Sequence, residues 1–150
     1  MSTARHQGLI EGRLEDVWRL VGDPNRHPEW WPKVMAVRGG AFAEGDTYRQ
    51  VTALPLGRHE TTIEVERLED LREIRTRCVD TGMYADWRFT EAREATFVDV
   101  EMGMEPAKFR YRVMDAATGN FYFRRWLEET VEQLRAAVEG GSDAERPPTS

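Results

Sequence analysis

The sequence contains a single cysteine, Cys78, among its 150 residues. One cysteine cannot form an internal disulfide bond or build a zinc site from several thiolates. No run of about 18 apolar residues is present, so we expect no membrane-spanning helix. Residues 1–12 also lack the apolar stretch of a secretion signal. Together these absences predict a cytoplasmic protein without a disulfide framework.

Positive charge is also scarce, because Lys and Arg total 21 against 27 Asp and Glu, which gives a net charge of −6. Binding to nucleic acid or anionic lipid needs a basic face, so we expect neither partner. The sequence contains no GxGxxG or GxxxxGKS/T phosphate loop, and His6, His27 and His59 show no metal-ligand spacing. We therefore predict no nucleotide, no metal and no other cofactor.

The remaining composition is typical of one folded domain. Apolar residues make up 40% and charged residues 32% of the chain, enough for a core but not for a large apolar exterior. We place the domain at residues 1–139. Residues 140–150 are rich in Gly, Pro and Ser and have little to bury, so we predict a disordered tail. The sequence leaves open whether the domain forms a homodimer.

The N-terminal part predicts one strand and two short helices. Residues 5–12 are expected to form the strand, and apolar side chains at positions 14, 17, 18 and 21 then share one face of a helix. Gly22 is expected to end that helix in a left-handed turn. Asp23 is the predicted N-cap of a second short helix, which begins with Pro24 and runs to about Trp30.

From residue 33 to about residue 105 the apolar pattern changes to alternation interrupted by turn residues, which favours an antiparallel meander. After Pro106 the period returns to that of a long helix, whose middle is weakened by Gly119 and Asn120. The expected strands are 33–38, 46–54, 58–67, 72–80, 84–91 and 96–105, and the expected helix stripe is Phe109, Val113, Ala117, Phe121, Leu127, Val131, Leu134 and Val138.

Pairing neighbouring strands across their turns predicts which side chains share a face of the sheet. Opposite charges that face each other suit a solvent face, whereas apolar pairs suit the interior. A slip of one residue would exchange the two faces, so agreement between separate turns is informative. The expected outer pairs are Glu64 with Arg77, Glu66 with Arg75, Arg49 with Glu64 and Arg88 with Asp99, and the inner pairs are Ile63 with Cys78, Val65 with Thr76, Trp87 with Val100 and Phe89 with Val98.

The inner face derived in this way is polar along the earlier strands. Each unpaired polar group in a dry core would cost about 1–3 kcal/mol, so we expect a partly wet cavity with apolar walls, which is typical of a small-molecule pocket. Met83, Met102, Met104 and Met114 could adapt to an irregular ligand or simply fill gaps. The predicted ligand-binding residues are Trp31, Tyr48, Gln50, Thr52, His59, Thr61, Ile63, Thr76, Cys78, Trp87, Phe89, Val100, Met102 and Met104.

Five segments carry a family resemblance: LEDVWRLVGDPNRHPEWWPKV, GDTYRQVT, LGRHETTIEVERLED, DWRFTE and RRWLEETVEQLRAAVEG. From Ile10 to Gly140 the chain resembles START-like, helix-grip proteins of the polyketide cyclase/dehydrase group in the SRPBCC superfamily. The resemblance implies an α+β helix-grip fold, in which a curved antiparallel sheet of about seven strands wraps around a long C-terminal helix. It also implies two short helices after the first strand and an apolar ligand tunnel. Related proteins bind lipids, hormones or polyketides, cyclise polyketides, or serve as chaperone partners, so the fold does not decide the chemistry.

Two residues of the inner face are candidates for catalysis. His59, expected across from Leu54, could act as a general acid or base, or could be a rim histidine bonded to backbone or water. Tyr48, beside Gln50, could polarise a ligand carbonyl, or its ring could only pack. Cys78 is better interpreted as an inert buried thiol, because a nucleophilic thiol needs a base or a positive neighbour.

Three functions are compatible with these patterns. The leading one is a carrier or sensor that holds a small hydrophobic molecule, for example an aromatic or polyketide-like one, in an internal cavity. The alternative is a cyclase or dehydratase, a lyase-like enzyme without cofactor, that uses His59 and Tyr48. The third is a protein-interaction module, which predicts an exposed apolar patch around Trp30 and Trp126 and a collapsed cavity.

Overall fold

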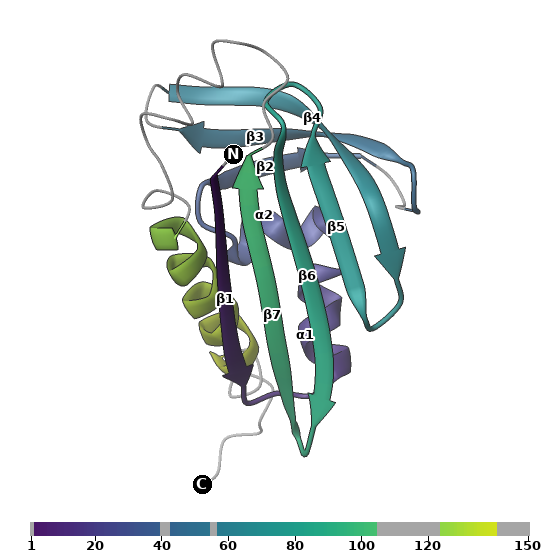
Figure 1. Ribbon diagram of the computed structural model, residues 1–150, viewed down its shortest axis with the longest axis vertical. Helices are drawn as coiled ribbons and strands as arrows, with labels where there is room; N and C mark the ends of the chain where they lie inside the picture. The colour runs from purple at the N-terminus through teal and green to yellow at the C-terminus, as the bar shows by residue number, and fades with distance from the viewer. Residues whose placement is uncertain (1, 40–42, 55–56, 105–123, 141–150) are drawn as a thin grey trace, which may run out of the picture.

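The computed structural model describes residues 2–39, 43–54, 57–104 and 124–140. Its elements follow the order that the sequence predicts, with one strand, short helices, six further strands and a C-terminal helix (Figure 1). In chain order they are β1 (Ser2–Ile10), α1 (Leu14–Val21), the 3₁₀ helix η1 (Pro24–Arg26), α2 (His27–Trp30), β2 (Val34–Arg38), β3 (Thr47–Leu54), β4 (Gly57–Glu69), β5 (Glu73–Cys78), β6 (Met83–Ala92), β7 (Ala95–Met104) and the C-terminal helix, described over 124–140.

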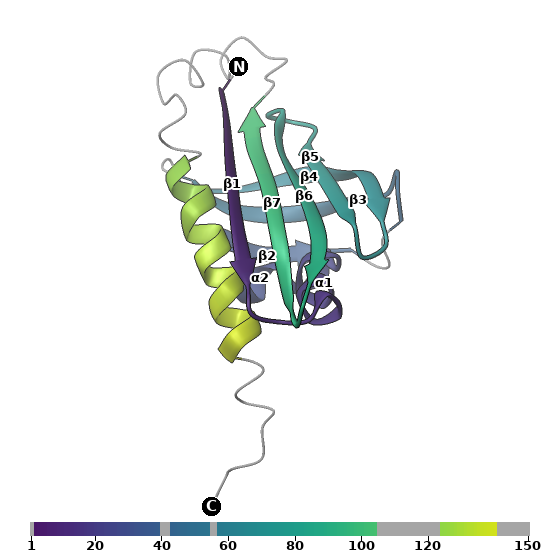
Figure 2. The same ribbon diagram turned by 60° about the horizontal axis from the view of Figure 1, so that its bottom comes forward.

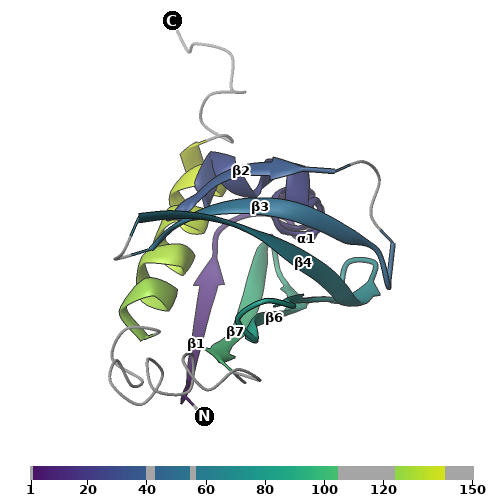
Figure 3. The same ribbon diagram turned by 90° about the horizontal axis from the view of Figure 1, so that it is seen from above.

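The seven strands form a single antiparallel sheet in the order β1-β7-β6-β5-β4-β3-β2. The sheet is strongly curved, so that β2, β3 and β4 arch over one side while β1, β7 and β6 lie opposite them (Figure 3). The C-terminal helix runs along the open side, next to β1 (Figure 2). The helix-grip architecture inferred from the resemblance is therefore confirmed, and the sheet is not closed because its edges β1 and β2 do not pair.

The C-terminal helix is fixed to both edges of the sheet. The Trp126 indole donates a hydrogen bond of 2.9 Å to the carbonyl oxygen of Pro32 beside β2, and Arg135 donates one of 3.3 Å to Leu9 in β1. The predicted stripe Leu127, Val131, Leu134 and Val138 is buried. The predicted part of the stripe from 109 to 121, with Gly119, Asn120 and Met114, and positions 141–150 of the predicted tail lie outside the described residues.

The two short helices form as predicted, with one correction. The Asp23 side chain accepts a hydrogen bond of 3.1 Å from the Asn25 backbone N–H, which caps η1. Gly22 ends α1, but its φ of −75° is right-handed, so the predicted left-handed turn is wrong. Glycine fits here because the Trp18 ring lies close to the backbone, so that a Cβ at this position would be 2.4 Å from Cε2 of Trp18.

This contact predicts that Gly22→Ala destabilises the fold by about 1–2 kcal/mol, although the backbone angles suit alanine. Without the Trp18 ring, alanine would instead stabilise by restricting the unfolded chain. The double variant Trp18→Leu/Gly22→Ala should therefore lose less stability than the two single changes added together. Urea denaturation of the four proteins measures this coupling, and additive losses would contradict it.

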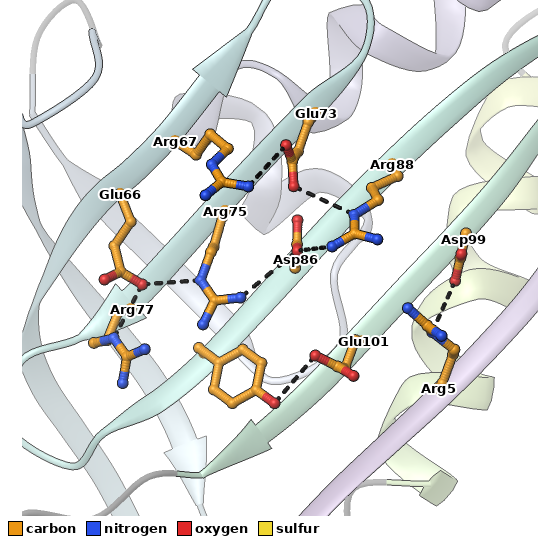
Figure 4. A network of polar contacts seen from close by, with 11 residues as sticks. Arg5, Glu66, Arg67, Glu73, Arg75, Arg77, Asp86, Arg88, Asp99 and Glu101 are labelled. Carbon is orange, nitrogen blue, oxygen red and sulfur yellow. Dashed lines mark hydrogen bonds and ion pairs between the residues drawn. The ribbon is translucent and has the colours of Figure 1, made fainter.

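Strand pairing confirms most of the predicted register. Glu64 lies opposite Arg77, Ile63 opposite Cys78 and Val65 opposite Thr76, and the β6–β7 pairs agree as well. A register shift between positions 65 and 67 corrects one pair, since Arg75 lies opposite Arg67 and not Glu66. The charges still meet across the bulge. Glu66 accepts hydrogen bonds from Arg75 at 3.1 Å and Arg77 at 3.0 Å (Figure 4).

The β3–β4 register is two residues away from the prediction. Arg49 pairs with Thr62 and not with Glu64, and Tyr48 pairs with Ile63. The turn is shorter than predicted, because Leu54 pairs directly with Gly57. A slip of two residues keeps every side chain on its predicted face, so the inner face is unchanged.

Within the described residues, no helix is long and apolar enough to cross a membrane.

Candidate ligand cavity

A cavity of about 60 Å³ lies inside the curve of the sheet. Its walls come from β3, β4, β5, β6 and β7, from the end of α2 and from the C-terminal helix. The predicted residues Trp31, Gln50, Thr52, His59, Thr61, Ile63, Thr76, Cys78 and Met102 line it, together with Thr81, Met83, Tyr84, Ala85 and Trp126.

The lining divides into a polar and an apolar flank. Four threonines, Gln50 and His59 supply hydroxyl, amide and imidazole groups, and Gln50 donates a hydrogen bond of 2.9 Å to Thr52. Met83, Met102, Trp31 and Trp126 contribute to the apolar flank. Among the described lining residues none is Asp, Glu, Lys or Arg. The described lining therefore presents hydroxyl, amide and imidazole groups, with no carboxylate, ammonium or guanidinium group among them.

Five predicted site residues lie in the core and not at the cavity. Trp87, Phe89, Val100 and Met104 belong to the main apolar cluster and are not among the lining residues, and Tyr48 packs with Ile63, Val65 and Cys78. Burial raises the pKa of the Tyr48 phenol above its ordinary value, and a side-chain hydrogen bond with Thr76 only partly opposes this. Inner-face alternation identifies residues on one side of a sheet but cannot separate cavity wall from packed core.

His59 lies at the rim of the cavity, where it is exposed. It pairs with Thr52, so the predicted position across from Leu54 is wrong. The cause is again the β3–β4 register, which lies two residues away from the predicted one. Tyr48 pairs with Ile63, four residues further along β4. At about 3.3 Å per residue, the backbones of His59 and Tyr48 are roughly 13 Å apart along the strand direction. The two residues therefore do not belong to one catalytic site.

Four lining residues were not predicted from the sequence, namely Thr81, Tyr84, Ala85 and Trp126. Ala85 lies directly opposite Thr76 in the β5–β6 ladder, so folding that hairpin in sequence would have placed it on the same wall. Trp126 directly precedes Leu127 of the predicted helix stripe, and both are buried. The burial of Trp30 and Trp126, each 4% exposed, also overturns the exposed apolar patch expected of an interaction module.

A second space lies on the outside of the same wall. This groove of about 420 Å³ runs between the α2–β2 connection and the C-terminal helix. It is lined by Pro28, Glu29, Trp30, Trp31, Pro32, Lys33, Val34, Glu129 and Gln133. Trp31 is the one described residue that lines both the groove and the inner cavity.

An aromatic cluster holds this wall in place. The Trp31 ring stacks on Trp30 at 5.4 Å and meets Trp87 edge-on at 5.6 Å and His27 at 5.0 Å. Burial lowers the pKa of His27 to about 4, so the imidazole is neutral at pH 7. Its Nε2 lies 2.8 Å from the Val21 carbonyl oxygen and must carry the proton, because a carbonyl only accepts.

Residues 2–139 match the family described as "Polyketide cyclase / dehydrase and lipid transport". A comparison with curated protein sequences finds no significant match.

Solved structures share the fold at low sequence identity. A protein from Thermus thermophilus superposes with a TM-score of 0.73 at 19% identity, over 93% of this chain and 99% of that one. A START superfamily protein from Mycobacterium smegmatis gives a TM-score of 0.69 at 14% identity, over 97% of this chain and 100% of that one. An AHSA1-like protein from Aeromonas hydrophila gives 0.66 at 15% identity, over 99% of each chain. At these identities the likeness establishes the fold and leaves the ligand open.

Proposed function

Because the chain belongs to the polyketide cyclase / dehydrase and lipid transport family, we propose that it binds a small, uncharged and mainly apolar molecule in its inner cavity. In this proposal the protein acts as a carrier or sensor in the cytoplasm, and an aromatic or polyketide-like molecule is the kind of ligand expected. The cavity-lining residues that were predicted from sequence are the ones we expect to contact it.

The observation that carries this proposal is the composition of the cavity wall. Ligand pockets are usually apolar with a few convergent polar groups, and this wall combines methionine and indole side chains with threonine hydroxyls. An ionised ligand would lose its hydration there without gaining a countercharge from the described lining residues, which is costly. A neutral ligand with one or two oxygen atoms would gain hydrogen bonds instead.

The size of the cavity adds a condition. Its volume of about 60 Å³ is room for roughly two water molecules, whereas ligand pockets usually measure about 300–1,000 Å³. The proposal therefore requires the wall to move when a ligand enters. The thioethers of Met83 and Met102 are flexible enough to repack around a guest, and the outer groove offers a further 420 Å³ next to the wall.

A matched ligand pair tests the neutral-ligand proposal. We expect 2-naphthol to bind saturably at pH 7 and 2-naphthoate, which has the same ring but an ionised carboxylate, to bind at least tenfold more weakly. Isothermal titration calorimetry on the full chain measures both. Equal affinity for the two compounds would contradict the neutral character of the site. Absence of saturable binding by 2-naphthol and by a wider panel of neutral aromatic compounds in native mass spectrometry would refute the proposed function.

A cyclase or dehydratase that acts on the same ligand is the second candidate, and the family description favours it. His59 and Tyr48 remain the residues proposed for catalysis. The geometry gives this candidate less support, because Tyr48 packs in the core and lies far along the strands from His59. If alanine at both positions leaves turnover of a polyketide-like substrate unchanged, this assignment is wrong.

A further inference from the structure

Trp31 lines two spaces, whereas Trp30 and Trp126 each line only one of them. Trp30 lines the outer groove and not the inner cavity, and Trp126 lines the inner cavity and not the groove. Trp31 lines both, and it is 7% exposed. Trp31 is therefore the described residue that the linings of a cavity of about 60 Å³ and a groove of about 420 Å³ have in common.

The three indoles of this wall differ in how they are anchored. Trp30 Nε1 donates a hydrogen bond of 3.0 Å to the Leu20 carbonyl oxygen, and Trp126 Nε1 donates one of 2.9 Å to Pro32. Trp31 Nε1 is buried and has no hydrogen-bond partner among the described residues. An unsatisfied buried donor raises the free energy of the closed arrangement and would gain a bond from an acceptor that came within reach.

The backbone of Trp31 is fixed on both sides, which limits motion to the side chain. Its N–H donates to the His27 carbonyl oxygen at 2.8 Å, and its own carbonyl oxygen accepts from the Val34 N–H at 3.2 Å. Among the described residues its ring makes no hydrogen bond and packs against Trp30, Trp87 and His27. A change of rotamer would thus move the indole without breaking a backbone or side-chain hydrogen bond of its own.

We propose that the Trp31 side chain is a movable partition, through which an uncharged ligand with a hydrogen-bond acceptor passes from the outer groove into the inner cavity. The indole N–H then donates to the acceptor of the bound molecule. The passage of a physiological ligand rests on the proposed function, but the movement of the partition does not.

Cys78 provides a test that needs no knowledge of the ligand. It is the single cysteine of the chain, it is buried, and it lines the inner cavity. N-ethylmaleimide is a small, uncharged, planar probe with carbonyl acceptors, and the thiolate adds to its double bond while water supplies the proton. The labelling rate of Cys78 therefore reports how easily such a molecule reaches the cavity.

We expect Trp31→Ala to accelerate Cys78 labelling by at least tenfold at constant pH. The matched control is Trp30→Ala, which removes an indole of the same cluster that lines only the groove, and here we expect less than a threefold increase. Both rates are measured at several low urea concentrations, so that labelling through global unfolding is recognised by its urea dependence. If Trp31→Ala does not fold, the labelling rate is measured on Trp31→Phe instead. In that case ¹⁹F relaxation dispersion of the unsubstituted chain, labelled with 5-fluorotryptophan, should show exchange at Trp31 but not at Trp30 or Trp126.

Two results would overturn the partition. One is equal acceleration by Trp30→Ala and Trp31→Ala, which would mean general loosening of the wall. The other is slower labelling in His59→Trp, which narrows the opposite rim, with no effect of Trp31→Ala, because access would then lie at the β3–β4 end. No saturable binding by 2-naphthol or by the wider neutral panel, together with a tenfold effect of Trp31→Ala, would refute the proposed function and leave the partition standing.

Discussion

Trp87→Ala is expected to destabilise the protein by about 3–5 kcal/mol, the usual cost of deleting a fully buried indole. Trp87 is 1% exposed and lies at the centre of the aromatic cluster. It meets Trp30 and Trp31 edge-on, each at 5.6 Å, and stacks on Phe89 at 6.3 Å. Removing it would leave three rings without support on one side, and the surrounding strand cannot collapse to fill the space.

Trp87→Phe is the matched control. Phenylalanine keeps one ring against its neighbours and also removes the Trp87 Nε1, which is buried and has no hydrogen-bond partner in the described part of the chain. We therefore expect it to recover more than half of the lost free energy of unfolding. Urea denaturation followed by circular dichroism measures all three proteins. A loss below about 1 kcal/mol for Trp87→Ala would show that the core is not packed at this point.

Trp87 also shows the limit of predicting a site from alternation. The sequence places it correctly on the inner face, opposite Val100, because the β6–β7 hairpin has a short turn and strong apolar pairs. Whether an inner-face residue touches a cavity depends on what packs above it. Here α2 brings Trp30 and Trp31 onto Trp87, and that tertiary contact has no signal in the strand pattern.

The fold itself is predictable because separate local signals agree. The charged pairs Glu64–Arg77 and Arg88–Asp99 and their apolar counterparts give the same inside and outside for different hairpins. The errors arise where the backbone departs from regular pairing, at the bulge after Val65 and at the short turn between Leu54 and Gly57. The two-residue slip keeps the side chains of β3 and β4 on their predicted faces, and the bulge changes the face only from Arg67 onward, so the predicted polar flank of the cavity survives both errors.

The outer face of the sheet contains a carboxylate pair that sequence analysis did not single out. The Asp86 side chain is 2% exposed and lies 3.1 Å from Arg88 and 3.6 Å from Arg75 (Figure 4). Glu73 accepts from Arg88 at 3.3 Å and Arg67 at 3.5 Å. Burial, and next the hydrogen bond and negative charge of Glu73, raise the pKa of Asp86 from 3.8 to about 6. Burial also acts to raise the pKa of Glu73, but its hydrogen bonds and the nearby arginines outweigh burial and lower that pKa overall.

These opposite shifts have opposite consequences for stability. Asp86 binds its proton more tightly in the folded chain, so its contribution is fully present below about pH 4 and is lost as the pH rises through about 6. Glu73 contributes stability above its ordinary pKa of 4.5, which is lost only at more acidic pH. Between about pH 5 and pH 7 the change in stability from this pair therefore comes mainly from Asp86.

Asp86→Asn is expected to be more stable than the parent protein at pH 7 by about 1–3 kcal/mol, since one pKa unit corresponds to about 1.4 kcal/mol. Asparagine stays neutral, its oxygen still accepts from Arg88, and its amide N–H can donate to Glu73. The advantage should shrink at pH 5, where Asp86 itself is largely protonated. Free energies of unfolding at both pH values measure the difference, with Asp86→Ala as the variant that loses the hydrogen bonds as well as the charge. An equal effect of Asp86→Asn at pH 5 and pH 7 would mean that Asp86 is ionised throughout and that the arginines outweigh its burial.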